Sequence, residues 1–410
     1  EVVPAGGVPV VAFLPGGAFR LGSGADLDGA RWSADKQLIV VGINYRLGAL
    51  GSLVLPALDD ALALPSGNQA LRDQQLALRW LQRNIAAFGG DPAKVTLFGQ
   101  SAGAQCACMQ LFAQGSEELV QRVVLDSGSC VHYPAIPLVR EKVRKVSEEL
   151  AAALCPDASD LLACLRTVPA MALVDWATNM GLRPFGENFS PQVDGVFLAE
   201  DPATALQAGR FLHVPLLIGT NLDEWGVVKL CGGSEVPRPT NALELAVIVY
   251  GLYPEHAADI LSLYLGSAGA ESATDTLGRI VRDSWFRCPS RALLRGVTAA
   301  NVKAYLFSFE LAPAVHGLEL DYVFGYPWVS PVLVPPAFST AAPLPLLPQL
   351  VTAMQGYWSA FALSGDPNTE GQPEWPAHEL ESDRHLVLSH PISTGSALST
   401  RECALWDSFY

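Results

Sequence analysis

The sequence predicts an α/β fold with a mostly parallel sheet, and three observations support this. Near-continuous apolar runs such as Leu38–Val41 and Val214–Ile218 are typical of strands that helices cover on both faces. These runs alternate with longer amphipathic segments, as expected when helices connect parallel strands. Half of the 410 residues are apolar and 16% are charged, so the chain can bury a large core and is not a disordered protein.

The expected elements follow one another along the chain. Strands are predicted at Val8–Leu14, Gln37–Tyr45, Val95–Phe98, Arg122–Leu125, Val214–Thr220, Ala304–Phe309 and His385–Leu388. Helices are predicted from about Leu71 to Phe88 and over Leu347–Leu363, where Ser364–Asn368 gives a stop signal. The stretches 129–191 and 235–283 have helical patterns, and we expect them to be helical insertions over the active site. Pro and Gly are scattered at turns and form no linker, so residues 1–410 are expected to form one domain.

The charge and the apolar runs limit the kinds of partner. The net charge is −15 and no Lys/Arg-rich run occurs, which argues against a nucleic-acid or anionic-membrane surface. No apolar run approaches the roughly 18 residues of a membrane-spanning helix. We therefore expect neither nucleic-acid binding nor a membrane span.

Ser101 is the predicted nucleophile. The apolar strand Val95–Phe98 leads into Gly99–Gly103, which reads Gly-Gln-Ser-Ala-Gly, and an Ala-rich helical stretch follows. In a Gly-x-Ser-x-Gly turn between a strand and a helix, the serine has a strained backbone, and the glycines avoid collisions with both elements. The helix N-terminus also directs backbone N–H groups at an anion forming there. A chance serine in an ordinary turn is the alternative, but the strand and helix on either side favour catalysis.

The loop Leu14–Phe19 is the predicted partner of this serine. It follows the first strand, and its Gly-Gly-Ala sequence lets bare backbone N–H groups approach a developing negative oxygen. We expect the donors to be the N–H groups of Gly17, Ala18 and Ala102. The nearby glycines at 22, 24 and 29 fail the spacing of a dinucleotide-binding loop, and no phosphate loop occurs, so no organic cofactor is expected.

A catalytic serine also needs a base and an orienting carboxylate, and on an α/β-hydrolase sheet their chain order is Ser, acid, His. The strand Val214–Thr220 leads to Asp223 and Glu224, and either fits the acid. Histidines 132 and 213 precede this acid, which leaves His256, His316, His378, His385 and His390. His316 is the best placed, because a loop connects it to the strand Ala304–Phe309 and the next residue is a glycine.

The chain resembles the type-B carboxylesterase/cholinesterase family of α/β-hydrolases. Similar segments run in order through nearly the whole chain: Pro15–Phe19, Asn44–Gly51, Asp73–Trp80, Asn84–Pro92, Gly99–Ala104, Asp126–Ser129, Asp194–Gly195, Asp223–Glu224, His316–Glu319 and Gly365–Asn368. The resemblance implies the α/β-hydrolase fold. It also implies hydrolysis of small carboxylic esters through an acyl-enzyme on Ser101, without a metal or an organic cofactor.

The resemblance also implies roles for single residues. The acid is Glu224, with Asp223 as the fallback, and the base is His316. Ser127 supports the acid by a hydrogen bond, and Glu319 is a buried carboxylate behind the catalytic residues.

The resemblance gives meaning to half of the eight cysteines. Cys155 and Cys164 bracket a loop that the family often closes, and Cys288 and Cys403 match the family's long-range pair. Two disulfides imply an oxidising compartment, so we expect a secreted or exported protein, whether extracellular, periplasmic or in the ER lumen. The remaining four have no assigned partner, and Cys106 and Cys108 are expected to be buried thiols rather than metal ligands: Cys106, Cys108, Cys130 and Cys231.

Three features depart from the family pattern. Pro15 stands where relatives usually have histidine, and Trp225 follows the acid where many have glycine. Members also carry a long segment before the oxyanion loop, whereas this chain begins shortly before it. The first strands of the family are therefore expected to be absent from this chain.

Two rival functions share this fold. A non-catalytic adhesion or scaffold protein typically lacks members of the triad, and all three positions are filled here. A lipase or polyester hydrolase would use the same chemistry and differ at the mouth of the pocket. The sequence therefore favours a serine carboxylesterase.

Overall fold

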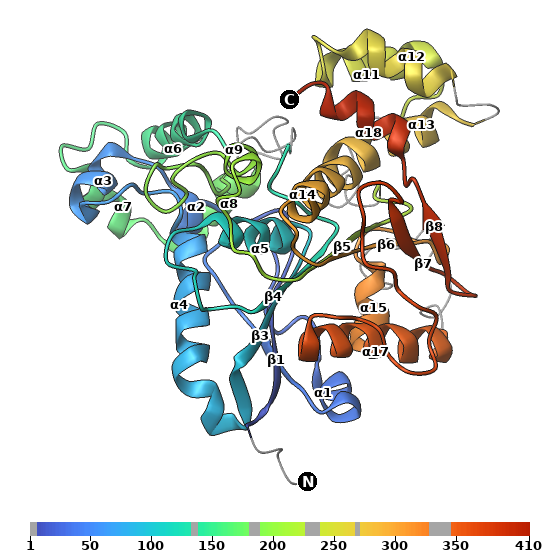
Figure 1. Cartoon of the computed structure of the whole chain (residues 1–410). Coiled ribbons are helices and arrows are strands. Elements are labelled where there is room, and N and C mark those ends of the chain that lie inside the picture. Colours follow the sequence, from blue (N-terminus) through green and yellow to red (C-terminus); the bar gives the residue numbers. More distant parts are fainter. Residues whose placement is uncertain (1–5, 133–137, 180–188, 226–237, 267–270, 328–345) are drawn as a thin grey trace.

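The computed structural model describes residues 6–132, 138–179, 189–225, 238–266, 271–327 and 346–410. These residues form a central sheet with helices on both faces (Figure 1). The sheet has the order β2-β1-β3-β4-β5-β6-β7-β8, and all neighbouring strands are parallel except β7 and β8. Its strands are β1 (Val8–Leu14), β2 (Ile39–Gly42), β3 (Gly90–Gln100), β4 (Arg122–Asp126), β5 (Leu216–Asn221), β6 (Ala304–Phe309), β7 (Arg384–Leu388) and β8 (Ser393–Ser396).

Helices connect and cover these strands. The first half of the chain contributes α1 (Ala30–Lys36), α2 (Gly48–Ser52), α3 (Pro56–Leu62), α4 (Gln69–Asn84), the 3₁₀ turn η1 (Ile85–Phe88), α5 (Ala102–Phe112), α6 (Arg140–Leu154), α7 (Leu161–Thr167), α8 (Ala170–Asn179) and α9 (Pro202–Gln207). The second half contributes α11 (Ala242–Leu252), α12 (Ala257–Gly266), α13 (Ala273–Val281), the π-helical turn η4 (Arg282–Arg287), α14 (Cys288–Ala299), α15 (Leu318–Phe324), α17 (Pro348–Ser364) and α18 (Thr400–Asp407).

The alternation of side chains along β1 divides the core into two layers. Val10 and Leu14 pack with α4, α5 and α14 on one face, while Val11 and Phe13 pack with α1, α15 and α17 on the other. Because successive residues of a strand point to opposite faces, a strand covered on both sides must be apolar throughout. This is why the buried strands appear in the sequence as continuous apolar runs, and the predicted α/β class is confirmed.

The predicted elements match the structure with two instructive differences. The strand predicted over Gln37–Tyr45 is shorter in the structure, where it is limited to β2. β2 pairs with Val10–Phe13 of β1, and soon after Phe13 the chain turns into the loop at Pro15. β8 was not predicted, because this edge strand is polar and largely exposed and so lacks an apolar alternation. The helix α17 ends as expected, with Gly365 at a φ of 78°.

Within the described residues, both stretches that carry helical patterns contain several helices joined by short turns. Residues 138–179 hold α6, α7 and α8, and the second stretch holds α11, α12, α13 and the start of η4. The second group has a core of its own with α18, which includes Trp225, Tyr264, Phe286 and Trp406. In Figure 1 this group lies at one end of the molecule beside α18.

Three disulfides stabilise the described part of the chain. Cys155 bonds to Cys164 and Cys288 bonds to Cys403, which are the two pairs that the family resemblance implies. The third bond, between Cys108 on α5 and Cys130 after β4, was not predicted.

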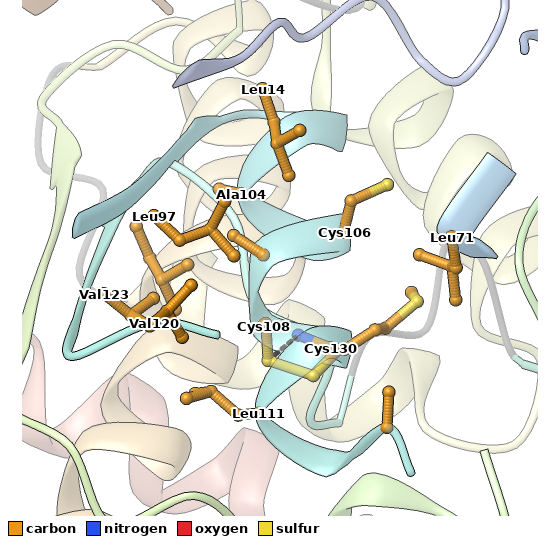
Figure 2. Packing of buried hydrophobic residues seen from close by; sticks show 14 of the residues in the cluster. Leu14, Leu71, Leu97, Ala104, Cys106, Cys108, Leu111, Val120, Val123 and Cys130 are labelled. Atoms are coloured by element: carbon orange, nitrogen blue, oxygen red, sulfur yellow. Dashed lines mark hydrogen bonds between the residues drawn. A yellow bond between two sulfur atoms is a disulfide. The ribbon is translucent and has the colours of Figure 1, made fainter. Parts of the chain in front are cut away.

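The Cys108–Cys130 bond corrects the expectation that Cys108 is a thiol. The two Cα atoms lie 5.6 Å apart because α5 packs against the segment that follows β4, and 22 residues of sequence hide this proximity (Figure 2). Cys106, on another side of α5, is a free buried thiol, and burial raises its pKa to about 12. Cys231 lies outside the described residues.

Candidate active site

Ser101 occupies a strained turn between β3 and α5. Its φ of 55° and ψ of −125° are unusual for a residue with a side chain, and such strain persists where the surrounding structure imposes it. Its backbone N–H donates to the Asp126 carbonyl at 2.8 Å, which ties the turn to β4. The next turn of chain passes so close to β1 that a Cβ on Gly103 would lie 2.0 Å from the Leu14 oxygen. The second glycine of the Gly-x-Ser-x-Gly pattern is therefore required by packing.

The predicted oxyanion loop lies at the end of β1 and is also strained. Gly17, Ala18 and Phe19 have φ values of 119°, 53° and 60°. The Gly17 carbonyl accepts from the N–H groups of the residues at 20 and 21, and the Tyr45 hydroxyl donates to the Pro15 carbonyl at 2.7 Å. Within the described part of the chain, the N–H groups of Gly17 and Ala18 make no hydrogen bond, so they are available to an acceptor that enters the site.

His316 and Glu224 form a buried pair between the ends of β5 and β6. His316 Nδ1 lies 2.5 Å from Glu224 Oε2, and the Glu224 side chain is fully buried. The other oxygen, Oε1, accepts from the Ser127 hydroxyl at 2.8 Å and from the Asn221 N–H at 2.7 Å. Because the carboxylate faces Nδ1, that nitrogen carries the proton and Nε2 has the free lone pair.

The geometry distinguishes between the two candidate acids. Asp223 is exposed, and its Oδ1 accepts from the Trp225 N–H at 3.0 Å. Its backbone N–H donates to the Ala314 carbonyl, which binds the acid loop to the loop before His316. Thus Glu224 contacts the imidazole, and Asp223 helps to hold the two loops together.

Two more carboxyl groups lie behind Glu224 in the protein interior. Glu319 on α15 accepts a short hydrogen bond from the Asn221 side chain, and Asp126 ends β4. Burial, with the negative charge of Glu224 second, raises the pKa of Glu319 to about 8. Burial and the carboxyl groups of Glu319 and Glu224 raise the pKa of Asp126 well above its usual value. Burial therefore disfavours the charged forms of Glu319 and Asp126, which lie behind the carboxyl group that contacts His316.

One neighbour of His316 was not anticipated. Gln100, the last residue of β3, places its side-chain Nε2 3.2 Å from His316 Nε2, and the Phe286 ring packs on the imidazole with centroids 5.0 Å apart. Within the described residues, the Ser101 hydroxyl makes no hydrogen bond. One indication of this contact was present in the sequence, because Gln100 directly precedes Ser101.

Asn221 and Asp126 were also missed by the sequence reasoning. Asn221 lies three residues before Glu224, and Asp126 directly precedes Ser127. Both positions lie within three residues of a residue that was predicted. Asn221 donates to Glu319, and the charge of Glu319 acts on Asp126. Because Glu319 lies on α15, which is distant in sequence, no local pattern indicated these interactions.

A cavity of about 360 Å³ begins beside the oxyanion loop and runs along α5. Phe19 is at one boundary, and Gln105, one helical turn after Ser101, lies on its wall. The remaining wall comes from the segment after β4, from α9 and from the C-terminal Tyr410. The cavity is lined by polar and apolar groups alike, which suits an uncharged organic group of moderate polarity. No group of three metal-binding side chains converges within the described residues.

Comparison with known proteins identifies the family. A model of the carboxylesterase family matches residues 3–406. The chain belongs to the carboxylesterase family. It is 30% identical over 421 residues to carboxylesterase 5A of Felis catus, an alignment that covers 97% of this chain and 74% of that relative. Carboxylesterase 5A of Canis lupus familiaris is also 30% identical, over 424 residues, with 97% and 70% covered.

Membership of the carboxylesterase family agrees with the site and the fold. It makes the chain a serine carboxylic ester hydrolase built on an α/β-hydrolase sheet, as the sequence indicated. Among the described residues, no single helix is long and apolar enough to cross a membrane, although α7 and α8, bent by 96°, would pass such a test together.

Proposed function

We propose that this carboxylesterase hydrolyses its ester through Ser101, with His316 as general base and Glu224 as the orienting acid. The observation that carries the proposal is the buried contact of 2.5 Å between His316 Nδ1 and Glu224 Oε2, at the same edge of the sheet as the strained serine turn. A serine at such a turn, with an imidazole whose tautomer is set by a carboxylate, is the arrangement that nucleophilic ester cleavage requires.

The first step forms an acyl-enzyme. Ser101 Oγ attacks the ester carbonyl while His316 Nε2 takes the hydroxyl proton, and the carbonyl oxygen becomes an oxyanion. The N–H groups of Gly17, Ala18 and Ala102 stabilise this oxyanion. Backbone donors held by a strained loop need no reorganisation as the charge develops, and such stabilisation lowers the barrier by several kcal/mol.

Collapse of this intermediate expels the alcohol, which takes the proton from the imidazolium. Water then attacks the acyl-enzyme, His316 again accepts a proton, and the carboxylic acid leaves with Ser101 restored. The Ser127 hydroxyl and the Asn221 N–H donate to Glu224 Oε1 and stabilise the negative charge of this carboxylate. That charge stabilises the imidazolium in both steps.

We also propose that residues 1–410 act as one domain in which the two helical insertions border the substrate. Phe286, in η4 just after the second insertion, packs on the His316 ring, and Leu138 and Val139, within the first, line the cavity beside α5. The three disulfides support a secreted or lumenal location, because such bonds persist in oxidising compartments.

Replacement of the serine tests the proposed nucleophile. In Ser101→Ala, kcat for p-nitrophenyl acetate should fall by about 10⁴-fold or more, and an organophosphate should no longer label the protein. Ser364→Ala, which removes an exposed hydroxyl from the end of α17, is the matched control and should behave like wild type. Undiminished turnover or labelling in Ser101→Ala would contradict the assignment.

Comparison of acyl chain lengths refines the substrate class. Wild-type rates on p-nitrophenyl acetate, butyrate and palmitate distinguish a carboxylesterase of small esters from a lipase of the same chemistry. A marked preference for the palmitate would indicate the lipase instead.

A further inference from the structure

Gln100 lies between the two halves of the proposed catalytic centre. It is only 6% exposed, and its side chain extends from the end of β3 toward His316. On the other side, Oε1 of the same side chain lies 2.7 Å from the position that a Cβ on Gly16 would occupy. The carboxamide therefore fills the space between the oxyanion loop and the imidazole, next to the hydroxyl that has to reach that imidazole.

The hydrogen bonds around His316 determine which group donates and which accepts. Glu224 Oε1 accepts from Ser127 and Asn221, and its Oε2 faces Nδ1, so Nδ1 donates to the carboxylate. His316 Nε2 is then an acceptor. The atom that faces it at 3.2 Å is an amide nitrogen, which can only donate.

We propose that Gln100 is a positioning residue for His316. In the resting enzyme its carboxamide donates a hydrogen bond to His316 Nε2. When the substrate binds, this hydrogen bond breaks and the Ser101 hydroxyl takes the place of the amide. The proposal rests on the proposed function of Ser101 and His316. It follows that the free base is occupied by Gln100, which agrees with a Ser101 hydroxyl that makes no hydrogen bond in the described structure.

The resting bond has a consequence for the protonation of the free enzyme. A donor on Nε2 stabilises the neutral imidazole and has to be broken before that nitrogen can bind a proton. Loss of the donor therefore makes His316 easier to protonate. Loss of one neutral hydrogen bond of ordinary strength should raise the pH at which His316 becomes protonated by about 0.5–1 unit.

Other charged groups set the absolute position of this titration. Glu224 contacts the ring directly, and Glu319 from α15 and Asp126 from β4 stand behind it. Arg287 of η4 interacts with Glu224 through space, although its hydrogen bonds go to the hydroxyls of residues 220, 308 and 399. All of these groups remain when Gln100 is changed, so a difference between variants reports on position 100.

The experiment compares the pH dependence of kcat/KM for p-nitrophenyl acetate in three variants. Gln100→Met keeps the shape of the side chain without the donor, and its acid limb should move up by about 0.5–1 pH unit. Gln100→Glu places an acceptor and a negative charge at Nε2, and its limb should move up by more than one unit.

Gln110→Met is the matched control. Gln110 is also buried and hydrogen-bonded, to the Leu71 carbonyl and the Ser116 hydroxyl, but it lies at the far end of α5. This variant should lose stability and keep the acid limb of wild type. A merely structural role of Gln100 would not move the acid limb in both Gln100 variants, with the larger shift in Gln100→Glu, while the limb of Gln110→Met stays unchanged.

A second measurement follows the attack by Ser101 itself. At a pH above the acid limb, Gln100→Met should be labelled by a small organophosphate about three to five times faster than wild type, because no hydrogen bond from the amide has to break before Ser101 reaches His316. An unchanged or lowered acid limb in Gln100→Met, or slower labelling, would overturn the proposal. Labelling that is lost in Ser101→Ala tests the triad independently, so a failure at Gln100 is distinguishable from a failure of the proposed function.

Discussion

The described part of the molecule contains two buried histidine–carboxylate pairs, and they differ in what else the carboxylate binds. Asp383 faces His378 Nε2 at 3.2 Å and also accepts two hydrogen bonds from the Arg291 guanidinium, at 2.9 and 2.6 Å. Glu224 faces His316 at 2.5 Å, and its remaining hydrogen bonds come from a hydroxyl and a backbone N–H. The charge of Asp383 is neutralised by the arginine, whereas that of Glu224 is available to an imidazolium.

The two imidazoles differ in the same way. The Thr298 hydroxyl contacts His378 Nδ1 at 2.8 Å, so both nitrogens of this ring are satisfied by permanent neighbours. His316 has one permanent partner and one amide that can move. A histidine held on both sides stabilises a fold, and one with a replaceable partner can transfer protons. Contact with a carboxylate is therefore insufficient to identify a catalytic histidine.

The largest expected contrast comes from removal of each imidazole. His316→Ala should lower kcat by about 10⁵–10⁶-fold while the protein remains folded, because the serine loses its base. His378→Ala should lower the melting temperature and leave kcat within a few-fold of wild type. Esterase assays and thermal unfolding of both variants check this. Loss of activity in a folded His378→Ala would show that His378 is also needed for catalysis.

Neutralisation of each carboxylate should give the next contrast. Glu224→Gln should lower kcat by about 10³–10⁴-fold, because an amide favours the wrong tautomer and no longer stabilises the imidazolium. Asp383→Asn should cost about 3–5 kcal/mol in the free energy of unfolding, because Arg291 remains buried without its anion. Chemical denaturation measured beside turnover separates the two effects.

A smaller pair of changes concerns the hydroxyls that support each site. Ser127→Ala removes a donor to the charged Glu224 and should lower kcat about tenfold. Thr298→Val removes the partner of His378 Nδ1 and should cost about 1 kcal/mol of stability without lowering kcat. If Ser127→Ala had full activity, the hydroxyl would be a support for the fold only.

The smallest expected effect is a pH dependence of stability from Glu319. Its pKa in the folded protein is raised to about 8 by burial, while the unfolded value is near 4.3. Its stabilising contribution is therefore complete below pH 4.3 and is lost as the pH rises through 8. Glu319→Gln should be more stable than wild type at pH 9 by about 1 kcal/mol or more, with little difference at pH 4. Denaturation at several pH values measures this, and parallel curves for both proteins would contradict it.

Much of the fold and of the candidate site was predictable because the signals are local. The pattern around Ser101 and the glycines of the oxyanion loop are short stretches whose spacing the backbone geometry requires. Edge strand β8 escaped prediction because its residues are polar and lack any alternation. The Cys108–Cys130 bond escaped because helix packing brings together two residues that no motif connects.

The sequence by itself determined the α/β class, predicted Ser101 as the nucleophile and gave a short list of acids and bases, from which the family resemblance implied Glu224 and His316. Those choices depend on residue type, chain order and neighbours a few positions away. Only the tertiary structure decided that Glu224 faces His316 while His378 is held by Asp383 and Thr298, and that Gln100 faces the catalytic imidazole. The physical reason is that the role of an ionisable side chain depends on all the groups that surround it. At this sheet edge those groups come from strands and helices that are distant in sequence.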